Sequence, residues 1–269
     1  MASIKPLIPA MSSRWKAGPR GQLAAWCMFD WGNSAFAAIV LSFVFAPYFT
    51  ESVAANREQG SQLWGQAMAV SALAIAVLSP IVGAFCDKGG QQKRWLFGFS
   101  AVAIIATAFM WFVTPDTGSV PLALVLVVIA NLSFELGYVF YNAILPRIAP
   151  KNLIGRVSGW GWGFGYLGSL SSIAIVLVLF VDGHLLDDLL DRAASEHIRI
   201  AAPFAAAWFA VFASILFLTV PDVPSTGLSS ARVVKEGIGE VLATVRLIRR
   251  LPSIGWYLAA HMVYIDGLN

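Results

Sequence analysis

Charged residues are scarce in this sequence of 269 residues. They make up 12% of the chain, against roughly 25% in a typical soluble domain, while hydrophobic residues make up 58%. Such a composition excludes an ordinary soluble domain. It predicts a polytopic membrane protein.

Cysteine and the common catalytic motifs are also scarce or missing. Cys27 and Cys86 both fall near the side that we expect to face the cytoplasm, where thiols stay reduced, so no disulfide is expected. The sequence contains no HExxH, no GxSxG and no aspartate cluster suited to a membrane phosphotransferase. We therefore expect neither an enzyme nor a bound metal or cofactor.

Apolar runs long enough to cross a bilayer recur along the chain. They lie at about 24–49, 62–85, 95–113, 121–142, 157–181 and 201–220. A seventh begins near residue 254, but it stops after about 16 residues where roughly 20 are needed. We therefore expect a fragment that lacks a C-terminal half present in the full-length protein.

Lys and Arg gather on one side of these runs, which predicts a cytoplasmic N-terminus. They lie in the tail, in the second and fourth connections and after the sixth run, at Lys5, Arg14, Lys16, Arg20, Lys88, Lys93, Arg94, Arg147, Lys151, Arg156, Arg232, Lys235, Arg246, Arg249 and Arg250. Topology alone thus accounts for the net charge of +3, and we expect no nucleic-acid partner. In a bacterial cell the protein would lie in the inner membrane.

The runs divide the chain into four parts. Residues 1–23 form a cytoplasmic tail, 24–220 a six-span bundle, 221–253 a cytoplasmic linker and 254–269 the start of span seven. In the linker, Val234, Ile238, Val241 and Val245 recur at helical spacing. This spacing predicts an amphipathic helix at the membrane surface.

The first span carries a carboxylate where hydrocarbon disfavours one. Asp30 and Asn33 are three residues apart, so they share one helix face, which must look at protein or water. Asp266 and Asn269 repeat the Asp-x-x-Asn spacing in the seventh run. We expect all four to bind a proton or the substrate, as paired halves of a transporter do with equivalent spans.

The fourth span carries a polar stripe. Asn131, Glu135, Tyr138 and Asn142 recur at steps of four, three and four. Glu135, and Asn131 beside it, are candidates for binding the substrate or a proton. The alternative is a buried glutamate that pairs with a neighbouring helix, and the sequence favours neither.

The glycines of the fifth span suggest helix packing, and the tryptophans suggest where the membrane boundaries lie. Gly163-x-Gly165-x-x-Gly168 fits a dinucleotide fingerprint, but no strand precedes it. Gly161, Gly165 and Gly168 instead predict a small-residue face for close helix packing. Most of the tryptophans, among them Trp26, are expected at the membrane boundaries.

The second connection has the pattern Gly83-x-x-x-Asp87-Lys88-x-Gly90, followed by Lys93 and Arg94. It resembles the loop signature of the major facilitator superfamily. The resemblance implies that Asp87 and the basic residues hold a cytoplasmic gate. Gln91-Gln92 replaces residues that are usually basic. The alternative is that Asp87 caps a helix and the lysines follow topology.

The segments WCMFDWGNSAFAAIVLSFVFAPYF, FYNAILPRIAP and GRVSGWGWGFGYLGS resemble the vacuolar-effluxer branch of the major facilitator superfamily. This branch groups fungal vacuolar amino-acid exporters with bacterial relatives. The resemblance implies two six-span halves around a central cavity, of which this chain supplies the first.

The sequence thus predicts an all-α membrane protein with a major facilitator-type six-helix bundle and an incomplete seventh span. The expected function is secondary transport of a small solute, with amino acids the class that the resemblance implies, by alternating access linked to protons. The alternative is a non-transporting half-bundle that serves as a scaffold or dimerises. The expected partners are a small-molecule substrate and the lipid bilayer.

Overall fold

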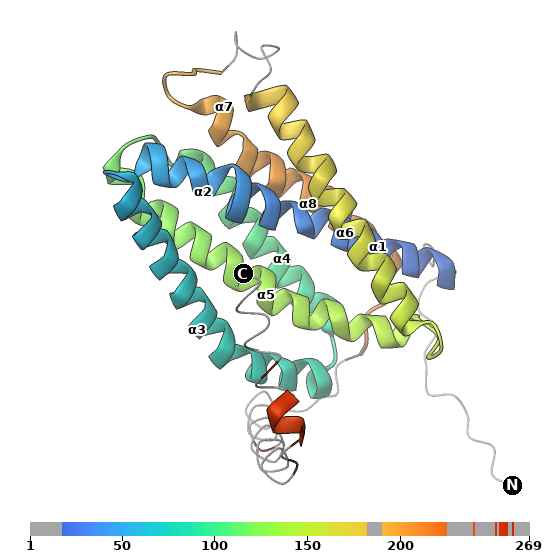
Figure 1. Ribbon diagram of the computed structural model, residues 1–269. Coiled ribbons are helices and arrows are strands. Elements are labelled where there is room, and N and C mark those ends of the chain that lie inside the picture. The colour runs from blue at the N-terminus through green and yellow to red at the C-terminus, as the bar shows by residue number, and fades with distance from the viewer. Residues whose placement is uncertain are drawn as a thin grey trace, which may run out of the picture.

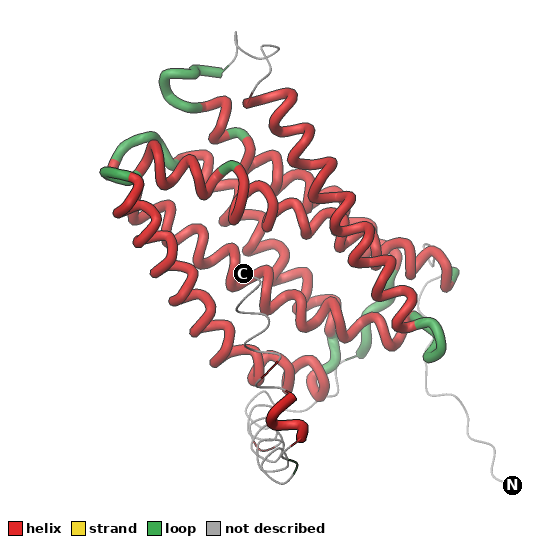
Figure 2. Tube along the Cα trace, in the orientation of Figure 1, coloured by secondary structure: helices red, strands yellow, loops and turns green. Residues whose placement is uncertain are grey.

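The computed structural model describes residues 18–181 and 190–224, with short pieces at 239, 251, 253–257 and 260. In these residues every regular element is helical, and loops lie only between helices (Figure 2). The elements are α1 Pro19–Phe36, η1 Ala37–Phe43, α2 Phe45–Tyr48, η2 Phe49–Val53, α3 Arg57–Gly89, α4 Gln92–Phe109, η3 Met110–Phe112, η4 Thr117–Ser119, α5 Val120–Ile148, α6 Ile154–Val176, η5 Leu177–Val181, α7 Glu196–Arg199 and α8 Ala201–Thr219.

Six helical segments in the described chain are long and apolar enough to cross a membrane, which confirms the predicted all-α membrane fold. They are Arg20–Val53, Arg57–Asp87, Gln92–Phe112, Thr117–Ile148, Ile154–Val181 and Glu196–Thr219. The protein is therefore an integral multi-pass membrane protein. Most of the predicted seventh span and nearly all of the predicted amphipathic helix lie outside the described residues.

Helix α1 is the centre of the packing. It contacts α6 and α8, which come from the far part of the sequence (Figure 1). Helix α4 packs against α5 and α8, and α3 packs along α5. Two apolar clusters fill the interior, one nearer each end of the bundle.

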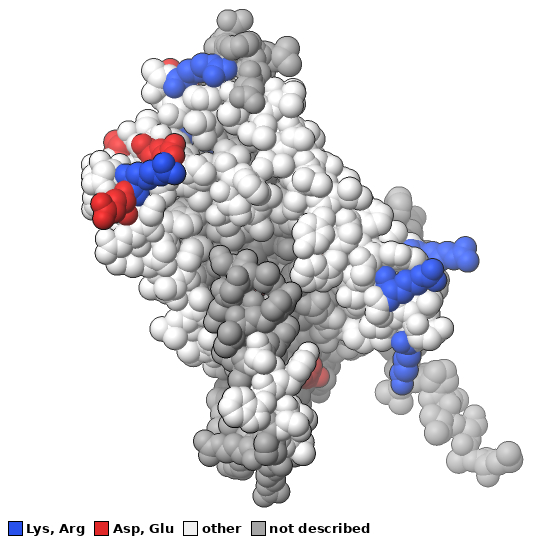
Figure 3. All heavy atoms as spheres, in the orientation of Figure 1, with Lys and Arg blue, Asp and Glu red and all other residues white. Residues whose placement is uncertain are grey.

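Short connections and short helices lie at the two ends of the bundle. The α3–α4 end holds the Gly90-Gln91 turn, the connection between α5 and α6 and residues 220–224, and the opposite end holds α2, η4 and α7. On the face shown in Figure 3, charged side chains gather toward the two ends and an uncharged surface separates them. This distribution suits a bundle whose middle lies in hydrocarbon.

Local signals explain where helices begin and turn. The Asn56 side chain accepts a hydrogen bond of 2.9 Å from the backbone N–H of Gln59, which caps α3. Gly90 and Gln91 adopt positive φ values of 69° and 52°, so the chain reverses there within two residues.

The first span is less regular than the sequence analysis predicted. It leaves α-geometry after Phe36, continues as a π-helix over Ala37–Phe43 and breaks at Val44, where φ is −123°. Pro47 lies one turn later. Its ring clashes with the carbonyl of residue 43 in a regular α-helix and it donates no backbone hydrogen bond, which accounts for the break.

The expectation for Trp26 was wrong, because this side chain is buried rather than interfacial. Trp26 is 2% exposed and its ring stacks on Tyr141 with centroids 4.4 Å apart. Its Nε1–H donates to the Tyr141 carbonyl at 3.1 Å, and the Tyr141 hydroxyl donates back to the Trp26 carbonyl at 3.0 Å. These two hydrogen bonds join α1 to α5, and they satisfy the indole N–H and the phenol hydroxyl inside the bundle.

Candidate functional site

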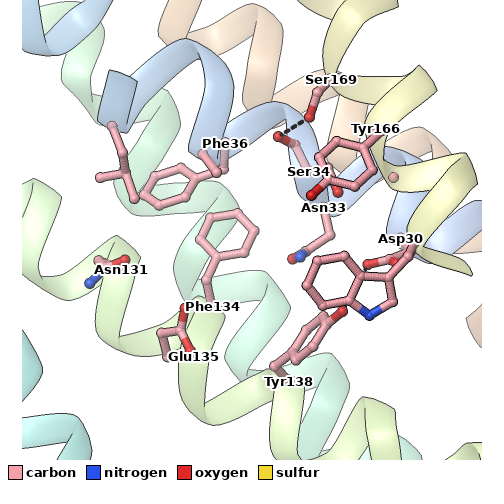
Figure 4. Close-up of a pocket in the computed structure, with 14 residues that line it drawn as sticks. Asp30, Asn33, Ser34, Phe36, Asn131, Phe134, Glu135, Tyr138, Tyr166 and Ser169 are labelled. Carbon is pink, nitrogen blue, oxygen red and sulfur yellow. Dashed lines mark hydrogen bonds between the residues drawn. The ribbon is translucent and has the colours of Figure 1, made fainter. Parts of the chain in front are cut away.

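A cavity of about 380 Å³ lies within the bundle, between α1, η1, α5 and α6. Figure 4 shows its polar and aromatic walls. The lining residues are Asp30, Asn33, Ser34, Phe36, Ala37, Leu41, Asn131, Phe134, Glu135, Tyr138, Trp162, Gly165, Tyr166 and Ser169.

Helix α1 supplies the buried carboxylate. Asp30, Asn33 and Ala37 line the cavity together, in line with the single helix face predicted for them. Asp30 is 4% exposed, and its Oδ1 accepts a hydrogen bond of 3.2 Å from the Tyr138 hydroxyl. Figure 4 shows Asp30, Asn33 and Tyr138 close together. A carboxylate and an amide are thus presented side by side to any solute in the cavity.

Helix α5 supplies the facing wall. Glu135 is exposed to the cavity and makes no hydrogen bond or ion pair with another described residue. Asn131 also lines the cavity, but its amide donates to Ser71 Oγ at 2.8 Å and so connects α5 to α3. Asn142, the last member of the predicted stripe, does not line the cavity. The open carboxylate of Glu135 therefore contrasts with the partnered carboxylate of Asp30.

Helix α6 approaches α1 through glycine. A Cβ on Gly161 would lie 2.5 Å from the Trp26 ring, and one on Gly165 would lie 2.7 Å from Ser34 Oγ. A Cβ on Gly168 would collide with the backbone of Trp31. These are the three glycines predicted to form a packing face, and they all meet α1.

Gly165 also belongs to the cavity wall. A Cβ at this position would lie 3.4 Å from Asp30 Oδ2. The absence of a side chain therefore leaves room beside the carboxylate oxygen that Tyr138 does not engage. Ser169, one turn along α6, donates to the Ser34 carbonyl at 2.9 Å and holds this wall in place.

The charge of the cavity is uncompensated in the described chain. Its lining contains two carboxylates, Asp30 and Glu135, and no Lys, Arg or His. An isolated buried charge is costly in a medium of low dielectric constant. The described lining of the cavity is therefore acidic, with no basic side chain to balance its two carboxylates.

The segment predicted to be a gating loop is mostly helical, which corrects the expected loop conformation, while its gating role stays a prediction. Gly83, Asp87 and Lys88 lie in the last turns of α3, while Lys93 and Arg94 begin α4. Only Gly90 and Gln91 form the turn between them. Asp87 is exposed and has no ion pair with another described side chain.

Lys93 instead fastens α4 to the end of α8. Its ammonium donates to the carbonyls of Phe217 at 3.0 Å and Val220 at 2.7 Å. Its backbone N–H donates to Asp222 Oδ1 at 3.0 Å. Helix C-terminal carbonyls are otherwise unpaired, so this lysine satisfies the end of α8.

Sequence reasoning missed part of the site. Trp162, Tyr166 and Ser169 line the cavity, and they recur at steps of four and three, the same helical spacing that marks the polar stripe on α5. The glycine face of α6 was a second signal for these residues. It predicts the face of α6 that packs on another span, and Trp162, Tyr166 and Ser169 lie beside that face. Asp266 and Asn269 lie outside the described residues.

The described chain is thus a membrane bundle of six candidate spans with a polar cavity between them. The same fold occurs in the xylose transporter XylE of E. coli. The partially occluded inward-open structure has a TM-score of 0.61 at 15% identity, covering 89% of this chain and 60% of XylE. The inward-open structure has a TM-score of 0.53 at 15% identity, covering 88% and 55%.

Residues 66–269 match the family model described as "Vacuole effluxer Atg22 like", and the chain belongs to that family. The MFS-type transporter YxiO of Bacillus subtilis (strain 168) is 26% identical over 258 residues, which are 91% of this chain and 57% of YxiO. YwoD, an MFS-type transporter of the same organism, is 32% identical over 107 residues, 39% of this chain and 23% of YwoD. The chain thus spans 57% of the length of YxiO.

Proposed function

We propose that this protein works as a secondary transporter, which carries a small solute across the membrane by alternating access. The observation that carries the proposal is the buried Asp30 in a cavity whose described lining holds no cation. Family membership and the transporter relatives support the same class of activity.

Asp30 and Asn33 are the central residues of the proposal. Asp30 binds a proton or the ammonium group of the solute, and Asn33 gives an amide hydrogen bond to the same solute. Glu135 offers a second carboxylate on the facing wall of the cavity. Asn131 lines the same wall, and its hydrogen bond to Ser71 holds α5 against α3. Asp266 and Asn269 would supply equivalent groups from the seventh span.

We propose amino acids as the solute class and protons as the coupling ion. Amino acids carry an ammonium group that suits the acidic wall, and the family description names an effluxer. The direction would then be export, away from the cytoplasm. The N-terminus would lie in the cytoplasm and, in a bacterium, the protein in the inner membrane, because Lys and Arg cluster on one side of the spans.

The proposed gate lies at the α3–α4 end. There Asp87, Lys88 and the basic residues that begin α4 would form the gate that opens or closes the cavity. Lys93 would stay bound to α8 through this change, so that α4 and α8 move together.

The test is transport of radiolabelled amino acids into proteoliposomes under an imposed pH gradient. Asp30→Asn keeps the shape of the side chain but removes its charge. We expect it to lower transport at least about tenfold, since loss of a charge-assisted hydrogen bond costs roughly 1.5–3 kcal/mol. We also expect the remaining transport to lose its pH dependence.

Glu58→Gln is the matched control, because Glu58 is an exposed carboxylate in the first turn of α3. It should transport like the wild type. If Asp30→Asn keeps both the wild-type rate and its pH dependence, the role of Asp30 is wrong. If no amino acid is transported by the wild type, the solute class is wrong.

A further inference from the structure

A second cavity lies on the outside of the bundle, between α4 and α8. Its volume is about 400 Å³, and its lining is almost entirely apolar. Small residues keep it open, with Ala101 on α4 facing Ala210 and Ala213 on α8. It shares no lining residue with the cavity around Asp30. We call it the α4–α8 groove.

The groove opens toward the surroundings of the spans. Ile105 is 57% exposed and Leu218 is 73% exposed, and both line it. At its α3–α4 end the rings of Phe97 and Phe217 pack edge to face, 5.3 Å apart. Both helices belong to candidate membrane spans, so the medium beside the groove is acyl chains.

The groove is more favourable when an acyl chain fills it than when it is empty. Side chains that line an unfilled gap lose dispersion contacts on one side. Water is a poor substitute, because most of the lining lacks hydrogen-bonding groups and the Ser214 hydroxyl already donates to the Val211 carbonyl. The groove therefore calls for a hydrocarbon tail.

Positive charge lies where the head of such a lipid would sit. Arg94 is in the first turn of α4, and Arg94, Ala101 and Ile105 follow one another at steps of seven and four, so they share a helix face. The Arg94 side chain is exposed and has no ion pair or hydrogen bond with a described residue. The Lys93 ammonium lies at the same end, beside the Phe217 carbonyl, and the nearby Asp222 carboxylate, which accepts from the Lys93 backbone N–H, offsets its charge. Arg94 therefore supplies the net positive charge of this end of the groove.

We infer that the α4–α8 groove binds an anionic phospholipid of the bilayer. The phosphate pairs with the Arg94 guanidinium, whose donors match phosphate oxygens. One acyl chain runs from there over Ala101 toward Ile105. Basic pockets between spans on the cytoplasmic side recognise anionic head groups by the same combination of charge and apolar wall. The inference does not depend on the proposed transport.

The test is lipid retention by the full chain in mixed bilayer nanodiscs. The discs contain equal amounts of phosphatidylglycerol and phosphatidylcholine, and native mass spectrometry counts the lipids that stay bound after gentle release. The wild type should retain phosphatidylglycerol in about fivefold excess. Equal retention of the two lipids would overturn the inference.

Two pairs of variants separate charge from shape. Arg94→Gln should abolish the excess, whereas Arg156→Gln, which changes an exposed arginine at the same end on α6, should keep it. Ala101→Phe should fill the groove and reduce bound lipid, whereas Val102→Phe, on the neighbouring lipid-exposed position, should not. Equal behaviour within either pair contradicts the site.

A measurement on the wild type covers the case in which Ala101→Phe fails to fold. Electron paramagnetic resonance of spin-labelled phosphatidylglycerol gives its relative association with the protein at low and high salt. The preference should fall toward that of phosphatidylcholine as salt screens the exposed Arg94. A preference that salt does not change would contradict pairing between Arg94 and phosphate.

Discussion

At the residue scale, the two oxygens of Asp30 have different surroundings. Oδ1 accepts the Tyr138 hydroxyl, and Oδ2 lies beside the empty position at Gly165. One oxygen is thus held by the protein while space remains near the other. Under the proposed function, Tyr138 is a positioning residue that acts through Asp30.

Tyr138→Phe tests this positioning role. The variant loses the hydrogen bond to Asp30 but keeps the ring, so we expect a normal fold and a weaker affinity for solute. A hydrogen bond to a charged group contributes roughly 1.5–3 kcal/mol, which corresponds to at least a tenfold rise in the KM of transport. Proteoliposome uptake over a range of solute concentrations and pH values measures it.

Tyr141→Phe is the control for this prediction. Tyr141 lies on the same helix, but its hydroxyl donates to the Trp26 carbonyl instead of to a residue of the cavity. It should lower the thermal unfolding midpoint without changing KM. Equal KM values for Tyr138→Phe and the wild type would show that the hydrogen bond to Asp30 has no part in solute binding.

At the element scale, close packing of α6 on α1 positions the cavity wall. The three glycines of α6 meet Trp26, Ser34 and the backbone of Trp31. Because lipid is as apolar as the helices, such packing rather than hydrophobic burial holds spans together. The wall that carries Tyr166 and Ser169 depends on this contact.

Gly168→Ala should separate α6 from α1. The added methyl group would collide with the Trp31 backbone, which cannot rotate away, and overpacking typically costs 1–3 kcal/mol. We expect a lower unfolding midpoint in detergent. Gly163→Ala is the matched control, since a Cβ there meets nothing within 4 Å, and it should not destabilise the protein. Equal midpoints for the two variants would refute the contact.

Lys93→Met should loosen the α4–α8 pair. It leaves the carbonyls of Phe217 and Val220 without their donor at a partly buried helix end. We expect a loss of roughly 1–3 kcal/mol of stability, measured by thermal unfolding in detergent. Lys151→Met removes an exposed lysine at the same end of the bundle and serves as the control. A stability loss in the control as large as in Lys93→Met would assign the effect to charge alone.

At the scale of the whole molecule, the bundle presents two different surfaces. The cavity lies between α1, α5 and α6, whereas the α4–α8 groove lies on two other spans. In the described part of the chain, the polar cavity inside the bundle and the apolar groove on its outside are therefore two distinct sites.

The proposed orientation gives a topology prediction. Lys151 lies at the α3–α4 end of the bundle and Ala55 at the opposite end, and both are exposed. Each is replaced by cysteine in a separate variant. In intact spheroplasts a membrane-impermeant maleimide should label Ala55→Cys, and it should label Lys151→Cys only after lysis. The native Cys27 and Cys86 are buried and provide little background. The reverse pattern would place the N-terminus outside.

Much of the fold followed from the sequence. The six apolar runs predicted the spans because a bilayer requires about 20 apolar residues per helix. Pro47 carried a signal for the break in the first span, but the apolar length around it concealed the irregularity. The position of Trp26 near a span end predicts an interfacial side chain, because tryptophans are enriched at membrane interfaces, whereas packing on Tyr141 buries it.

The sequence by itself determined which residues are exceptional in a membrane span. Asp30, Asn33 and Glu135 stand out because hydrocarbon penalises them, and the glycines of α6 stand out by their spacing. Only the tertiary structure decided which spans meet, so that Tyr138 reaches Asp30 across 108 residues and Lys93 reaches the end of α8. The physical reason is that, in lipid, the faces that contact protein and the faces that contact lipid are equally apolar, so hydropathy does not distinguish them.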